Sequence, residues 1–169
     1  MLKSWGAFLG FVFMMITGMV SAGCGDPVKG FFMPREYQAF FESPFSGQRE
    51  ALLEFPIEKQ IDIYLYGVKV YHPPRVDLAF VIARQGPKVI APLLARLKQE
   101  NDDHTRSDLM EVLAAVRIVN PQFRYDQDVI QYLEEVTHAM NNANAKRLSE
   151  DSLRILKSER PEREVLPRP

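Results

Sequence analysis

Residues 87–119, PKVIAPLLARLKQENDDHTRSDLMEVLAAVRIV, contain two apolar stripes separated by a short polar segment. Apolar side chains recur at intervals of three and four residues in each stripe. The first stripe contains Ile90, Leu93, Leu94 and Leu97, and the second contains Leu109, Val112, Leu113, Val116 and Val119. This spacing places each set on one face of a helix with about 3.6 residues per turn. The segment therefore predicts two amphipathic helices joined by a turn at residues 100–104, the second capped by Asp103 or Thr105.

Helical spacing continues on both sides of this segment. Further helices are expected after Pro56, where Ile57, Ile61, Tyr64, Leu65 and Val68 have helical spacing, and at residues 75–84 before Gly86, 126–140 and 148–157. Gly67 weakens the first of these helices near its end, and the Pro73-Pro74 pair stops it. No stretch alternates apolar and polar residues for long enough to predict a strand, although residues 61–70 come nearest. The expected fold class is all-α, built from antiparallel helix pairs.

The unit from Pro87 to Val119 resembles a HEAT repeat. Gly86-Pro87 leads into the first helix, Pro92 lies inside it as these repeats tolerate, and an Asp-containing turn precedes Arg106 in the second helix. The flanking pairs, residues 56–84 and 126–157, match in apolar spacing alone. The resemblance implies a short HEAT-like solenoid, and an irregular helical bundle is the alternative.

The N-terminal residues have the order of an export signal. Lys3 precedes an apolar run at residues 5–20, and small residues at 21–23 lead to Cys24, the only cysteine of the 169-residue chain. The segment resembles a bacterial lipoprotein signal, which implies cleavage before Cys24 and lipidation of its sulfur. This implies a bacterial envelope protein, lipid-anchored to a membrane and facing the periplasm or the exterior. The alternative is an ordinary signal peptidase site after Ala22, which would release a soluble secreted protein beginning at Gly23.

Four segments follow from these patterns. Residues 1–23 are the expected cleaved signal, and residues 24–47 a lipid-anchored tether with a short aromatic helix at 35–42. Residues 48–157 are the expected helical domain, and the charged, Pro-rich residues 158–169 are an expected disordered tail.

The composition of the chain bears on its partners and on what stabilises its fold. The chain has 21 Lys and Arg residues against 22 Asp and Glu residues, a formal net charge of −1, which argues against a nucleic-acid partner. A single cysteine allows no disulfide within the chain, so the domain must be stable through packing alone.

Residues 64–74, YLYGVKVYHPP, have the most unusual composition in the chain. Tyr side chains combine large contact area with a hydroxyl, so Tyr64, Tyr66, Tyr71 and His72 form a possible partner-binding surface. On a continuous helix Tyr64 and Tyr71 would share a face. The alternative is that Tyr64 belongs to the core and the remaining residues cap the helix end.

No catalytic motif accompanies these features. Glu100, Asp102, Asp103 and His104 are interpreted as solvent-facing residues and helix caps, since their spacing lacks the glycine and distal glutamate of a calcium loop. No metal site and no cofactor are expected. The favoured hypothesis is a non-enzymatic protein-interaction module with a protein partner. The alternative is an envelope hydrolase acting on cell-wall or lipid material, using His72 or His104 with a nearby carboxylate.

Overall fold

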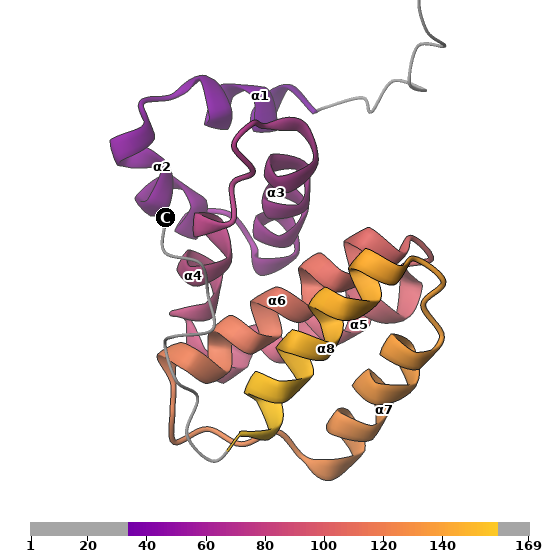
Figure 1. Ribbon diagram of the computed structural model, residues 1–169. Helices are drawn as coiled ribbons and strands as arrows, with labels where there is room; N and C mark the ends of the chain where they lie inside the picture. The colour runs from indigo at the N-terminus through magenta and orange to yellow at the C-terminus, as the bar shows by residue number, and fades with distance from the viewer. Residues whose placement is uncertain (1–33, 159–169) are drawn as a thin grey trace, which may run out of the picture. The chain divides into compact units, whose positions relative to one another are not determined.

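The computed structural model describes residues 34–158, and this part of the chain is all-α, which confirms the expected fold class (Figure 1). The signal segment, Cys24 and most of the charged tail lie outside the described residues. In chain order the elements are α1 (Arg35–Glu42), α2 (Phe45–Leu53), α3 (Ile57–Val70), α4 (Asp77–Ala83), the 3-10 helix η1 (Gly86–Val89), α5 (Ile90–Gln99), α6 (Asp103–Val119), α7 (Gln127–His138) and α8 (Ala143–Lys157).

Most of the expected helices are present at the expected places. The helix expected at residues 35–42 is α1, and the one after Pro56 is α3. The quoted segment forms η1, α5 and α6, and Pro92 lies within α5. Gly86 has φ +76°, the left-handed conformation that glycine adopts easily. The residue that caps α6 is Asp102, and the prediction of Asp103 or Thr105 is wrong. The Asp102 carboxylate accepts hydrogen bonds from Thr105 N at 2.9 Å and Thr105 Oγ1 at 2.6 Å.

Two helices depart from the expectation. Helix α2 was not predicted, and the expected boundary between residues 47 and 48 falls inside it. Helix α8 begins at Ala143 rather than at Leu148, because the Asn142 side chain caps it by accepting from Asn144 N at 3.1 Å and Ala145 N at 3.0 Å.

Helix α6 forms the centre of the core. Its buried positions include Leu109, Met110, Val112, Leu113 and Val116, and α4 and α8 make the most extensive contacts with it. Helices α6 and α8 lie side by side and run in the same direction. Hydrogen bonds connect their N-terminal ends to each other and their C-terminal ends to each other. Asp103 Oδ2 accepts from Asn141 N and Asn142 N at the N-terminal ends, while Arg117 Nη2 donates to Ser158 O at the C-terminal ends.

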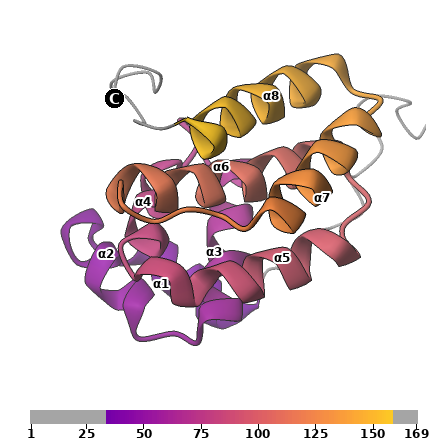
Figure 2. The same cartoon turned by 90° about the horizontal axis from the view of Figure 1, so that it is seen from below.

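Three helix pairs stack along this core. Within the pairs α3–α4, α5–α6 and α7–α8, the two helices contact each other. Between neighbouring pairs, the second helix of one pair contacts the second helix of the next, α4 with α6 and α6 with α8. The first helices α3 and α5 also contact each other. Figure 2 shows α5, α6 and α8 one above another when this part of the chain is seen from below.

Helices α1 and α2 add an aromatic layer at the N-terminal end of the stack. Tyr37, Phe40 and Phe41 of α1 are buried. The Phe40 ring meets the Phe41 ring edge-on at 5.0 Å and the Phe55 ring at 6.2 Å, geometries that aromatic pairs favour. The N-terminal aromatic residues that the structure describes therefore belong largely to the core.

Candidate functional site

An aromatic cluster forms where α3 ends. Helix α3 stops at Val70, and Tyr71 is extended, with φ −93° and ψ 143°. The Tyr71 ring consequently lies back on Phe41 of α1, stacked with a centroid distance of 4.4 Å. Tyr66 completes the cluster, with its ring 5.7 Å from that of Phe41 and 6.4 Å from that of Tyr71.

Gly67 allows this close packing. It is buried, and a Cβ at this position would lie 3.0 Å from Arg75 Cβ and 3.1 Å from the Phe41 ring. Its carbonyl also accepts hydrogen bonds from Tyr71 N at 3.3 Å and Arg75 N at 3.4 Å, which holds the residues after α3 against the helix end. Gly67 is therefore an interior packing position as well as a weak helix former.

Arg75 connects the aromatic cluster to α2 and α4. Its guanidinium donates to both carboxylate oxygens of Asp77, at 2.9 and 3.1 Å, and to Gln48 Oε1 on α2. The Phe45 ring covers this guanidinium, with Arg75 Cζ 4.4 Å from the ring centroid. Arg75 is itself buried, so Phe45 rests on a rigid support.

Apolar side chains of α2, of the end of α3 and of the residue before α4 are exposed. Phe45 is 58% exposed, Val70 at the end of α3 is 45% exposed, and Val76, next to Arg75 in the chain, is 43% exposed. We call Phe45, Tyr66, Tyr71, His72 and Val76 the aromatic corner. It is the candidate functional site, since large side chains held rigidly at a surface suit protein contacts.

The structure separates Tyr64 from the other predicted site residues. Tyr64 is fully buried against α6, whereas Tyr66 and Tyr71 are half-buried and His72 is exposed. The expectation that Tyr64 and Tyr71 share a helix face is wrong, because the helix ends before Tyr71. Phe45 and Arg75 are not among the predicted site residues, and no motif in the sequence distinguishes Phe45 from the other aromatic residues near it.

The acidic turn between α5 and α6 is a capping structure. The Thr105 side chain and backbone lower the pKa of Asp102 through hydrogen bonds, and Asn142 N and Asn141 N lower the pKa of Asp103 in the same way. Glu100 Oε1 accepts from Asn101 N and Asp102 N, at 2.9 and 3.1 Å. Over residues 34–158, no group of three or more His, Cys, Asp or Glu side chains has an arrangement that could hold a metal ion.

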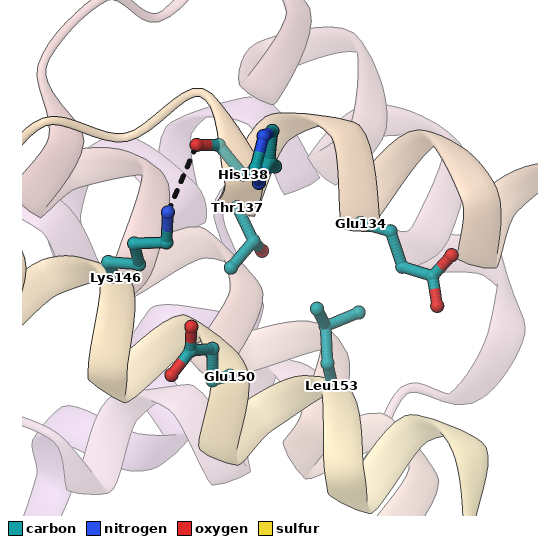
Figure 3. A pocket seen from close by; sticks show the side chains of 6 residues that line it. All are labelled: Glu134, Thr137, His138, Lys146, Glu150 and Leu153. Atoms are coloured by element: carbon teal, nitrogen blue, oxygen red, sulfur yellow. Dashed lines mark hydrogen bonds between the residues drawn. The ribbon is translucent and has the colours of Figure 1, made fainter.

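An open groove of about 290 Å³ lies between α7 and α8 (Figure 3). Its lining residues are Glu134, Thr137, His138, Lys146, Glu150 and Leu153. Lys146 Nζ donates to the backbone oxygen of His138 at 3.2 Å, and Glu134 forms an ion pair with Lys157. Figure 3 shows Lys146 and Glu134 at opposite ends of the groove. This arrangement is not the closed cleft that a buried catalytic site requires.

The two histidines proposed for a hydrolase are both exposed. His72 lies in the connection between α3 and α4, and His104 lies in the first turn of α6. In the described part of the chain, neither imidazole ring is hydrogen-bonded to a carboxylate. His72 and His104 therefore give no observation that favours the hydrolase over the interaction module.

Comparisons with protein-family models, curated proteins and solved structures find no significant match for this chain. Among the described helices, none is by itself long and apolar enough to span a membrane. The segments Asp77–Ala83 and Gly86–Gln99 reach that length and composition only as a pair bent by 113°.

Proposed function

We propose that this protein is a lipid-anchored envelope lipoprotein whose helical domain binds a protein partner through the aromatic corner. The anchor is the Cys24 sulfur, which follows an apolar run and small residues as a lipoprotein signal requires. Each buried methylene of an acyl chain contributes about 0.8 kcal/mol, so several chains would hold the domain firmly at a membrane.

The observation that carries the binding proposal is the exposed Phe45 ring on buried Arg75. A side chain that is already ordered loses little conformational freedom on association, and an ordered aromatic ring therefore makes a good anchor for a partner. Tyr66 and Tyr71 extend this rigid surface, because both rings are packed against Phe41.

The order of the helix contacts supports the HEAT-like interpretation. Second helices α4, α6 and α8 pack in succession, which is how stacked helix pairs bury a continuous core. Architectures of this kind present extended surfaces for proteins. A non-enzymatic interaction module is accordingly the function that the described residues favour.

The anchor is tested by labelling cells with radioactive palmitate. The wild-type protein should incorporate the label, and Cys24→Ala should lose it at equal expression, because no other cysteine is available. Equal labelling of both proteins would refute lipidation at Cys24. A wild type that carries no label and is released into the medium would favour the secreted alternative.

The binding surface is tested by crosslinking in intact cells, with quantitative identification of the captured protein. Phe45→Ala should lower recovery of the specific partner at least about tenfold, the order expected when a central interface residue is removed. Leu148→Ala is the matched control, since Leu148 is an exposed apolar residue at 41% on α8. Equal recovery of the partner with the wild type, Phe45→Ala and Leu148→Ala would show that Phe45 is not part of the binding surface.

A further inference from the structure

The two ends of the helix stack differ in what covers them. At the N-terminal end, α2 contacts both helices of the first pair, and the buried rings of Phe40 and Phe41 lie beside it. At the C-terminal end, no element of the described chain follows α8, and the groove between α7 and α8 is open. Terminal pairs of stacked helical repeats need a cap. The α7–α8 pair is therefore where a further segment of the chain would be of use.

The chain leaves α8 at one end of this groove. Lys157, the last residue of α8, forms an ion pair with Glu134, which lines the groove on α7. The next residue, Ser158, is held in place because Arg117 Nη2 donates to its backbone oxygen at 2.7 Å. The backbone of Ser158 is extended, with φ −66° and ψ 140°, so the chain turns away from the helix axis there. Residues 159–169 therefore start beside the Glu134 end of the groove.

This segment is long enough to return along the whole groove. Lys146, at the other end of the groove, precedes Lys157 by eleven residues, which is about 17 Å along a helix that rises about 1.5 Å per residue. The six residues that follow Ser158 span about 20 Å when extended. A chain that folds back at Ser158 thus brings Glu164 level with Lys146.

The groove has charges of opposite sign at its two ends. Figure 3 shows Glu134 at one end and Lys146 with His138 at the other. Lys146 Nζ donates to the backbone oxygen of His138, and an ammonium group has two further donors for another acceptor. Glu150, one helical turn after Lys146 on α8, adds a carboxylate between the two ends. The far end of the groove therefore suits an anion, and the part before it suits a cation.

The charges of residues 159–169 match this order. When Glu164 is level with Lys146, Glu150 lies between the levels of Arg160 and Arg163. A guanidinium of either arginine can then pair with the Glu150 carboxylate, while the Glu164 carboxylate pairs with the Lys146 ammonium. Opposite charges meet at both places.

We propose that residues 159–169 fold back along the groove between α7 and α8 and cap the C-terminal end of the helix stack. Composition predicts disorder for this segment because it has little apolar surface of its own. The groove supplies apolar contacts through Leu153 and Thr137. Since the segment is joined directly to α8, the association is intramolecular and needs few contacts. This inference depends neither on lipidation of Cys24 nor on the aromatic corner.

The direct test attaches a nitroxide label at Val165→Cys, in a full chain whose only native cysteine is replaced by Cys24→Ala. In the NMR spectrum of this chain, the amide signals of Thr137, His138 and Glu150 should lose most of their intensity through paramagnetic relaxation. The signals of α3, which is not part of the groove, should keep theirs. Loss confined to the last turn of α8 would overturn the proposal.

A mixing experiment identifies which chain supplies the segment. Chains labelled with nitrogen-15 but without nitroxide are mixed with unlabelled chains that carry the nitroxide at Val165→Cys. The groove signals should keep their intensity in this mixture, because each groove is occupied by its own chain. Loss of these signals would show that a second copy supplies the segment, which contradicts the intramolecular cap.

Charge reversal tests the pairing of Glu164 with Lys146. Lys146→Glu should lower the ratio of docked to free segment about two- to fivefold, the order for loss of an exposed ion pair. Adding Glu164→Lys to that variant should restore the ratio. Lys88→Glu, at an exposed lysine of η1, is the matched control and should leave the ratio unchanged. Equal relaxation of the groove signals in the wild type and Lys146→Glu would refute this pairing and the register that depends on it.

Discussion

Arg117→Ala should lower the free energy of unfolding by about 3–5 kcal/mol, the range for loss of a large buried side chain together with its hydrogen bonds. Arg117 is fully buried in α6. Its guanidinium donates to the backbone oxygen of Pro121 and, at 2.7 Å, to that of Ser158. Truncation leaves a cavity and removes these hydrogen bonds, one of which joins α6 to the C-terminal end of α8.

Urea-induced unfolding of the full chain measures this effect. Arg124→Ala is the matched control, because Arg124 is exposed and donates to the same Pro121 oxygen, at 2.6 Å, from the neighbouring loop. Its loss should cost less than about 1 kcal/mol, as is usual for an exposed side chain. Similar losses for the two variants would show that the burial of Arg117 is unimportant.

Gly67→Ala should destabilise the protein by about 1–3 kcal/mol, the cost of overfilling a packed interior, even though alanine is the better helix former. The new methyl would lie 3.0 Å from Arg75 Cβ and within 3.2 Å of two Phe41 ring carbons. The side chains cannot retreat freely, because Phe41 is stacked on Tyr71 and Arg75 is hydrogen-bonded to Asp77.

Gly47→Ala is the control for this substitution. Gly47 lies in α2, and a Cβ there would meet nothing within 4 Å. Alanine should therefore increase stability by about 0.5–1 kcal/mol through helix propensity alone. Urea unfolding should show that Gly67→Ala lowers the free energy of unfolding and that Gly47→Ala raises it. The near-ultraviolet circular dichroism spectrum should change only for Gly67→Ala. Stabilisation by both substitutions would refute the packing argument.

The helices with clear apolar stripes were predictable from local spacing. The apolar positions from Ile57 to Val68 and from Ile90 to Val119 lie in α3, α5 and α6 as their spacing predicts, because burying one helical face requires apolar residues at regular intervals. Helix α2 lacks such a stripe, with Gly47 in its first turn, and only Gln48 and Leu52 are buried. The start of α8 depends on a cap made by Asn142, and the polar residues around Asn142 also suit a turn.

The candidate site was predictable only in part. Composition singled out Tyr66, Tyr71 and His72, which lie together at the end of α3 or just beyond it. It also singled out Tyr64, which is buried instead against α6. The heptad spacing predicts that Tyr71 continues the helix, whereas the backbone is extended at Tyr71 and its ring stacks on Phe41 of α1.

The sequence by itself determined the all-α class and the residues that each main helix buries, since both depend on neighbours within a few turns. Only the tertiary structure decided which polar groups meet. Gln48 and Arg75 are 27 residues apart, Arg117 and Ser158 are 41 apart, and Tyr64 and Glu111 are 47 apart. Such pairs depend on how helices lie against one another, and helical periodicity contains no information about that arrangement. The candidate binding corner arises at this level.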